Sequence, residues 1–228
     1  MLYDERAVKD NLRNREGRRV FFLGKEDRLT PSARDWLARE RIPILSGEQA
    51  AITRYHLLGG GFCTEKPEHM THLHGDVLVE KTHPRIAFRG AVDTLEAELI
   101  LCKLKTGLKP VQEVLDLARR LIRCDVLGEP VGDFTLDGMG QEEQRRLSHF
   151  PQEQLGIAHF MPQPEDGERI AILNRCRCVC RAAELAACRA FTDKDGQVLR
   201  GDILQALNRM SSMLYILMLR EKAGKQPT

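Results

Sequence analysis

Apolar positions follow two different patterns on either side of about residue 80. Up to residue 75, short apolar runs alternate with glycine, histidine and charged residues, whereas from residue 84 onward apolar residues recur every three or four positions over long stretches. The second spacing is that of one face of an α-helix. We therefore expect an N-terminal extension over residues 1–75 and a helical domain over residues 76–228.

The extension carries signals for short strands and one helix. Residues 19–23 are an apolar run ended by glycine, and residues 42–45 are a second apolar run, so each predicts a short strand. Between them, Thr30 followed by Pro31 suits the start of a helix over residues 31–40. Three consecutive glycines at 59–61 indicate a flexible joint. The extension is thus expected to be a small mixed α/β structure.

Four or five helices are predicted in the second region. They cover about residues 84–105, 110–127, 141–155, 166–190 and 202 onward. Gly107 and Gly128 end the first two, and Pro151 is expected to bend the third. Long helices joined by short connections pack antiparallel in a bundle. The fold class expected is therefore an all-α core.

Composition and charge limit the classes of partner and the cellular location that we expect. There are 35 Lys and Arg against 33 Asp and Glu, a net charge of +2, which gives no reason to expect nucleic acid. The charged start carries no apolar signal segment, and no apolar run is long enough to span a membrane. Seven cysteines without an export signal favour free thiols in a reducing cytoplasm. We expect a cytoplasmic protein.

The first candidate site is the segment 81–97, which contains Lys81, Arg85 and Asp93. Asp93 stands among apolar helical residues, and an acid on an apolar face needs a cation. The alternative is a solvated aspartate on the outer face of the helix. The residues alone leave both open.

A second candidate lies in the predicted helix 166–190. Arg177, Arg181 and Glu184 are spaced i, i+4 and i+7, so they share one face. Two guanidinium groups one turn apart suit a polyphosphate, whose oxygens they bind in pairs. The alternative is an exposed ladder of charges. In the last helix, Asn208 falls among apolar positions and is either a structural hydrogen-bond hub or a ligand contact.

A group of potential metal ligands lies before the helical region. It comprises His56, Cys63, His69, His72 and His74. Imidazole and thiolate groups are able to bind Zn²⁺ or Fe²⁺. The spacing matches no strong metal motif, so this site is a hypothesis about a His/Cys-containing loop.

Three segments, in order, resemble motifs of the cobalamin adenosyltransferases, and most closely of their ethanolamine-utilization (EutT) type. Residues 81–97 resemble K-x-x-P-R-I-x-A-[YF]-G-x-V-D-E-L-N-A, residues 177–184 resemble R-T-x-x-R-R-A-E, and residues 207–211 resemble L-N-R-L-S. The resemblance implies a five-helix bundle that transfers the 5′-deoxyadenosyl group of ATP to Co(I) of cobalamin. It also implies Mg²⁺ and a homo-oligomer, trimer or dimer, with ATP bound between subunits.

The resemblance assigns roles residue by residue. The residues that it assigns to ATP and its magnesium are Arg181, Glu184, Asn208, Lys81 and Arg85. Of these, Lys81 and Arg85 would lie near the phosphates. Asp93 and Arg177 match an Asp–Arg pair across the subunit interface. In PduO-type relatives an aromatic residue just before a proline displaces the lower base of cobalamin, and here the matching stretch contains His159 and Phe160. Phe160 is the wedge that we expect.

The resemblance also implies a setting. The product would serve ethanolamine degradation, with a reductase and an adenosylcobalamin-dependent ammonia-lyase as partners and a bacterial microcompartment as a location. EutT proteins often carry a C-C-x-x-C cluster, of which only Cys63 is present. Two other functions are weighed: a non-catalytic cobalamin-binding or scaffold protein of such a compartment, and a metal-sensing regulator built on the histidine-rich segment.

Overall fold

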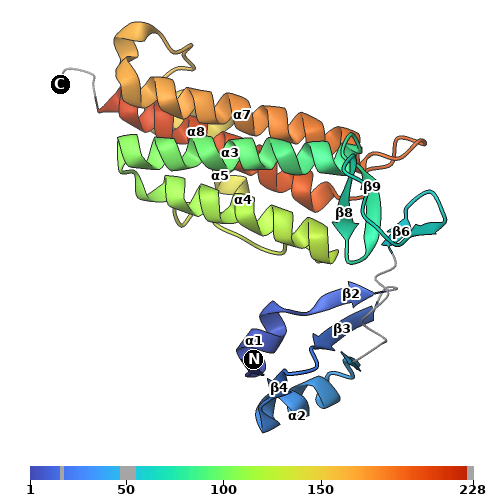
Figure 1. The fold of residues 1–228 in the computed structure, drawn as a ribbon. Coiled ribbons are helices and arrows are strands. Elements are labelled where there is room, and N and C mark those ends of the chain that lie inside the picture. The colour runs from blue at the N-terminus through green and yellow to red at the C-terminus, as the bar shows by residue number, and fades with distance from the viewer. Residues whose placement is uncertain (16–17, 47–54, 225–228) are drawn as a thin grey trace. The chain divides into compact units, whose positions relative to one another are not determined.

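The computed structural model describes residues 1–15, 18–46 and 55–224 (Figure 1). The chain divides into two units, Met1–Lys81 and Thr82–Thr228. The division falls six residues later than the expected boundary at 75/76. The reason is a strand, Val77–Glu80, which pairs within the N-terminal unit.

The first part of the N-terminal unit is α/β. Its elements are β1 (Leu2–Tyr3), α1 (Glu5–Asp10), β2 (Arg13–Arg15), β3 (Arg18–Leu23), β4 (Arg28–Leu29), α2 (Pro31–Arg39) and β5 (Ile44–Ser46). The sheet order is β2-β3-β5, with β3 and β5 parallel, and β1 pairs with β4. Its small core consists of Val8, Phe21, Ala33, Leu37 and Ile42.

The predicted strand 19–23 and helix 31–40 are confirmed. The hydroxyl of Thr30 accepts a hydrogen bond from the amide of Ala33, which caps α2. The second strand begins at Ile44 rather than at residue 42, because the amide of Ile42 donates to the carbonyl of Leu37 and closes the helix. The prediction of one helix was wrong, since α1 also forms, with Asp4 as its N-cap.

The rest of the N-terminal unit is a four-stranded sheet where a His/Cys-containing loop was expected. Its strands are β6 (Tyr55–Leu57), β7 (Phe62–Cys63), β8 (Met70–His74) and β9 (Val77–Glu80), in the order β7-β6-β9-β8. Gly59–Gly61 is the turn between the paired strands β6 and β7, not a joint between regions. Gly60 and Gly61 have positive φ, a conformation that glycine adopts without steric cost.

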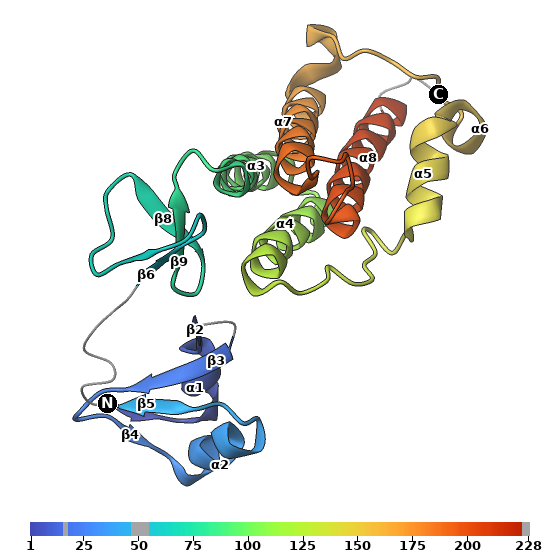
Figure 2. The same cartoon turned by 90° about the vertical axis from the view of Figure 1, so that its right-hand side faces the viewer.

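The second unit is helical. Its elements are α3 (Pro84–Thr106), α4 (Lys109–Leu127), α5 (Gln141–His149), α6 (Pro151–Leu155), η2 (Pro164–Asp166), α7 (Gly167–Phe191) and α8 (Gly201–Ala223). Helix α7 packs against α3 and α8, α4 packs against α3 and α8, and α5 lies beside α8 (Figure 2). The interior is a continuous cluster of apolar side chains from these helices. The expected helical core is thus observed.

Glycine and proline set the ends of these helices as predicted. Gly107 and Gly128 end α3 and α4 with φ of 69° and 68°. Pro151 does more than bend the third predicted helix. Phe150, the residue before it, leaves helical geometry, so the segment forms two short helices, α5 and α6.

None of the helices in the described part of the chain is long and apolar enough to cross a membrane.

Candidate functional site

Three of the predicted residues lie on two neighbouring helices, and two of the three are in contact. Arg177 and Glu184 lie on α7, and Asn208 lies on the neighbouring α8; all three side chains are half-buried. Asn208 donates a hydrogen bond from Nδ2 to Oε1 of Glu184 at 3.2 Å. Among the described residues, the second oxygen of Glu184 accepts no hydrogen bond. One carboxylate oxygen is therefore left for a ligand.

Arg209 holds the other end of the Asn208 amide. Its Nη2 donates to Oδ1 of Asn208, and its Nη1 donates to the main-chain carbonyl of Gln141 at 3.3 Å. Burial, followed by the nearby charge of Arg145, lowers the pKa of Arg209 from its usual value. This cation thus links α8 to the start of α5.

A cavity of about 230 Å³ opens beside Arg177. It lies where α5 ends and where α7 and α8 face each other, and every residue that lines it carries a polar group. The lining residues are Ser148, His149, His159, Arg177, Ser211, Ser212 and Tyr215. Hydroxyl, imidazole and guanidinium groups make it a place for hydrogen-bonding groups of a ligand.

Tyr215 is the common contact of the side chains around this cavity. Its ring stacks on His159 with 5.8 Å between ring centroids and 11° between planes, and on Phe160 with 6.4 Å between centroids. The guanidinium carbon of Arg177 lies 5.7 Å from the centre of the same ring. Arg177 also donates from Nε to Oδ1 of Asn174 at 3.3 Å. The tyrosine therefore joins Arg177 to the segment that carries the expected wedge.

Both ring nitrogens of His159 have partners. Nε2 lies 3.2 Å from the carbonyl oxygen of His149, and Nδ1 lies 2.9 Å from the hydroxyl of Tyr215. A carbonyl only accepts, so Nε2 carries the proton, and in the neutral ring Nδ1 accepts from Tyr215. The tautomer of His159 follows from this geometry.

Phe160 is half-buried rather than free. It packs between the ring of Tyr215 and the ammonium of Lys222, whose Nζ lies 5.5 Å from the ring centre. Met161, the next residue, is 82% exposed. Phe160 thus has the support that a wedge requires, and its role remains a prediction.

Asp93 and Arg181 are exposed and lie outside these contacts. Asp93 is on α3 and, among the described residues, forms no ion pair within the chain. The pair between Asp93 of one subunit and Arg177 of another remains a prediction.

Arg85 makes its contacts elsewhere in the helical unit. Arg85 donates from Nε and Nη2 to Oδ1 of Asp125, at 3.0 and 2.7 Å, and Arg89 donates to the other carboxylate oxygen at 2.7 Å. The Asp125 side chain is fully buried, so Arg85 is fixed where the start of α3 contacts the end of α4. Lys81 is exposed at the end of the N-terminal unit, where its amide donates to the carbonyl of His69.

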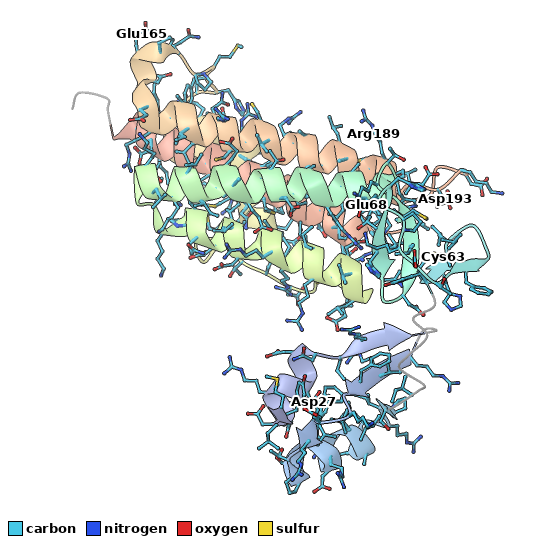
Figure 3. The ribbon with its side chains drawn as sticks, in the orientation of Figure 1. Asp27, Cys63, Glu68, Glu165, Arg189 and Asp193 are labelled. Carbon is cyan, nitrogen blue, oxygen red and sulfur yellow. The ribbon has the colours of Figure 1, made fainter. Side chains whose placement is uncertain are left out.

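The potential metal ligands do not come together. Cys63, labelled in Figure 3, pairs with Tyr55 across β7 and β6, and the ring of Tyr55 contacts that of His72. His56 and His74 pair with opposite edges of Val77, so a strand separates them. No three His, Cys, Asp or Glu side chains within the described ranges form a group that could hold a metal ion. These residues do not fit a Zn²⁺ or Fe²⁺ site in this arrangement.

Sequence reasoning missed Tyr215, Arg209 and Asp125. Tyr215 follows Asn208 by seven residues, which places it two turns along the same face of α8, and this spacing could have identified it. Asp125 had no such signal, because its partners lie 36 and 40 residues earlier.

Comparisons with known proteins agree with one another. The sequence model of a family described as cobalamin adenosyltransferase matches residues 62–221. The corrinoid adenosyltransferase EutT of Escherichia coli K12 is 34% identical, over 90% of this chain and 86% of that protein. The EutT of Salmonella typhimurium LT2 is 32% identical, over 86% of this chain and 84% of that protein.

A solved structure is also similar. A variant of the PduO-type ATP:corrinoid adenosyltransferase from Lactobacillus reuteri, complexed with cobalamin and ATP, covers 77% of this chain and 92% of its own at 15% identity, with a TM-score of 0.49. The family match spans more than half of the sequence, and the two curated relatives exceed 30% identity over most of it. On these matches, the chain belongs to the cobalamin adenosyltransferase family.

Proposed function

We propose that this protein is an ATP:cob(I)alamin adenosyltransferase. The observation that carries the proposal is the contact of Asn208 on α8 with Glu184 on α7, in a member of this family that also presents Arg177 on α7. Relatives named corrinoid adenosyltransferase EutT support the same activity. We assign α3, α4, α5, α7 and α8 as the five helices of the family bundle.

Helices α7 and α8 carry the groups that a nucleoside triphosphate needs. Arg181 lies one turn from Arg177 and is exposed, so its five N–H donors are available to phosphate oxygens. Glu184 offers one carboxylate oxygen, the type of ligand that Mg²⁺ prefers. We assign Arg177, Arg181, Glu184 and Asn208 to ATP and its magnesium. Lys81 and Arg85 are proposed for the phosphate end.

The reaction needs no nucleophile from the protein. Co(I) of the substrate donates an electron pair to the 5′ carbon of ATP, a Co–C bond forms, the C5′–O bond breaks, and triphosphate leaves with that bonding pair. The protein orients the two substrates and neutralises the charge that builds on the leaving group. Arginine side chains would perform the second task, together with the positive charge of a Mg²⁺ ion that Glu184 would hold.

The aromatic contacts support a role beside the corrin. Phe160, backed by Tyr215, offers an apolar surface that would exclude water and the lower base from cobalt. Removal of axial ligands makes the reduction of Co(II) to Co(I) easier. In this proposal, Phe160 contacts the corrin, and Tyr215 holds the Phe160 ring in place.

The exposed surface of α3 and α7 supports a homo-oligomer, either a trimer or a dimer. Ile100, Leu101 and Leu104 on α3 are 41%, 50% and 77% exposed, and Leu185 on α7 is 62% exposed. Large apolar side chains with this exposure lose contact with water if a second subunit covers them. Since Asp93 lies on α3, we propose that a second subunit pairs its Asp93 with Arg177.

The relatives' names support a metabolic setting. We propose that the product serves ethanolamine degradation, with a reductase and an adenosylcobalamin-dependent ammonia-lyase as partners. The cytoplasm, or a microcompartment within it, is the proposed location.

An anaerobic assay tests the activity directly. ATP, Mg²⁺ and chemically generated cob(I)alamin are mixed with the protein, and the absorbance of adenosylcobalamin is followed. The wild type is expected to form product, and Arg181→Ala to lose most of it, while Arg189→Ala, an exposed arginine two turns along α7, keeps wild-type activity. Without product or ATP binding, the non-catalytic scaffold function would replace this proposal.

A further inference from the structure

We propose that Arg209 is a positioning residue for ATP. It fixes the side-chain amide of Asn208, and Asn208 in turn holds Glu184, the carboxylate that we assign to the magnesium ion of ATP. The inference rests on the proposed function, and it gives Arg209 a role that acts through two neighbours rather than through contact with the nucleotide.

The orientation of the Asn208 amide is set from both ends. A guanidinium group only donates hydrogen bonds, so Arg209 must face the amide oxygen. A carboxylate only accepts, so Glu184 must face the amide nitrogen. If Arg209 were absent, a half-turn of the amide would place its oxygen against the Glu184 carboxylate, where two acceptors repel. Arg209 thus selects the orientation that holds Glu184.

The bonds of Arg209 differ from those of the arginines that join helices. Arg169 on α7 forms a double hydrogen bond with the carboxylate of Glu221 on α8, and Arg85 on α3 donates twice to the carboxylate of Asp125 on α4. Within the described part of the chain, the acceptors of Arg209 are an amide oxygen and a main-chain carbonyl, both neutral. A half-buried cation without a carboxylate in contact is costly. Charge pairing therefore does not explain the place of Arg209, whereas orientation of the Asn208 amide does.

The location is consistent with this role. Asn208 and Arg209 are consecutive on α8, and the anchor of Arg209 is Gln141, the first residue of α5. The backbone of α5 therefore holds the Arg209 side chain while it orients Asn208 on α8. Its position is fixed before any ligand binds.

Binding of ATP, measured by calorimetry with Mg²⁺ and again with EDTA, tests the inference without the chemical step. Arg209→Met keeps an unbranched stem but removes every hydrogen-bond donor. Arg209→Lys keeps an ammonium group, which only donates and therefore still selects the amide oxygen of Asn208. We expect Arg209→Met to weaken Mg-ATP binding about tenfold, because a bond to a charged group is lost. ATP in EDTA should bind with nearly unchanged affinity, and Arg209→Lys should recover most of the loss.

A matched control separates positioning from folding. Arg220 lies on the same helix and donates to Asp137 and Met139, so Arg220→Met removes an arginine that also bridges to another segment. Arg220→Met should leave Mg-ATP affinity unchanged. If the thermal midpoint of Arg209→Met fell well below that of Arg220→Met, Arg209 would be a structural bridge, and the proposal would be overturned.

The Glu184→Gln background gives the sharpest comparison. A glutamine both donates and accepts, so it can pair with either orientation of the Asn208 amide. Arg209→Met should therefore have little effect on Mg-ATP affinity in that background. An equal loss in both backgrounds, or no loss in either, would overturn the proposal.

These experiments distinguish failure of the Arg209 proposal from failure of the proposed transferase activity. If this coupling is found in a protein that forms no adenosylcobalamin, the transferase proposal fails and the role of Arg209 stands. Normal adenosylcobalamin formation without the coupling would reject the role of Arg209 alone.

Discussion

The hydroxyl of Tyr215 and Nδ1 of His159 lie 2.9 Å apart, although 56 residues separate them in the sequence. The contact joins α8 to the segment between α6 and α7, and the same tyrosine ring lies against Phe160 and Arg177. One side chain thus connects the proposed phosphate side of the site to the proposed corrin side.

Two substitutions of Tyr215 should separate its hydroxyl from its ring. Tyr215→Phe keeps the stacking and removes one neutral hydrogen bond, so turnover with cob(II)alamin and a reductant should fall about fivefold. Tyr215→Leu also removes the platform beneath Arg177 and Phe160, and a larger fall with a raised KM for cobalamin is expected. Steady-state assays give both values. Wild-type activity of Tyr215→Phe would contradict a role for the hydroxyl, and equal activity of the two variants would contradict a role for the ring.

Phe160→Ala should affect one form of the substrate more than the other. If Phe160 keeps ligands away from cobalt, the variant loses activity with cob(II)alamin but retains it with chemically reduced cob(I)alamin, where no reduction is needed. Parallel assays with the two substrates measure the ratio. Met161→Ala, which changes the exposed neighbour, is the control. Full activity of Phe160→Ala with cob(II)alamin would rule out the wedge.

Leu104→Glu should dissociate the proposed oligomer. Leu104 is 77% exposed on α3, and a buried, unpaired carboxylate at an interface is strongly unfavourable. Light scattering after size-exclusion chromatography should give a smaller mass for the variant and retained helicity by circular dichroism. Leu199→Glu, at a leucine 66% exposed between α7 and α8, should leave the mass unchanged. A monomeric wild type would refute the oligomer.

Asp202 should contribute to acid sensitivity. The Arg200 guanidinium beside it lowers the pKa of the Asp202 carboxyl to about 2, against about 3.9 in an unfolded chain. Because the folded-state pKa is the lower one, the carboxylate stabilises the fold above pH 4, and that contribution is lost as the pH falls toward 2. Urea unfolding should show Asp202→Asn less stable than the wild type at pH 6. The difference should narrow at pH 3; a constant difference would exclude this linkage.

The helices were predictable because their signals are local. Prolines and glycines set the ends of α3 and α4, and the spacing of Arg177 and Glu184 placed them on one face of α7. The pairing of Asn208 with Glu184 was within reach, since a polar residue on an apolar face needs a partner. Here the contact between α7 and α8 follows from residue types and helical periodicity.

The remaining features depend on contacts that no local pattern encodes. The second sheet was missed because β8, Met70–His74, contains two histidines and buries only Leu73, so alternation is weak. The stacking of His159 on Tyr215 depends on the path of the chain between α6 and α7. The anchoring of Arg85 depends on Asp125, a single acid near the end of an amphipathic helix.

The bonds from Arg85 and Arg89 to Asp125 have a consequence for the order in which the protein unfolds. A two-residue connection joins α3 to α4 at one end, and these bonds join the helices at the other, so the pair forms a closed loop. Separation of α4 would strand a buried carboxylate without its cations, which is strongly unfavourable. The helical hairpin therefore opens as one cooperative unit, and its amide protons exchange with solvent together rather than fraying from either end.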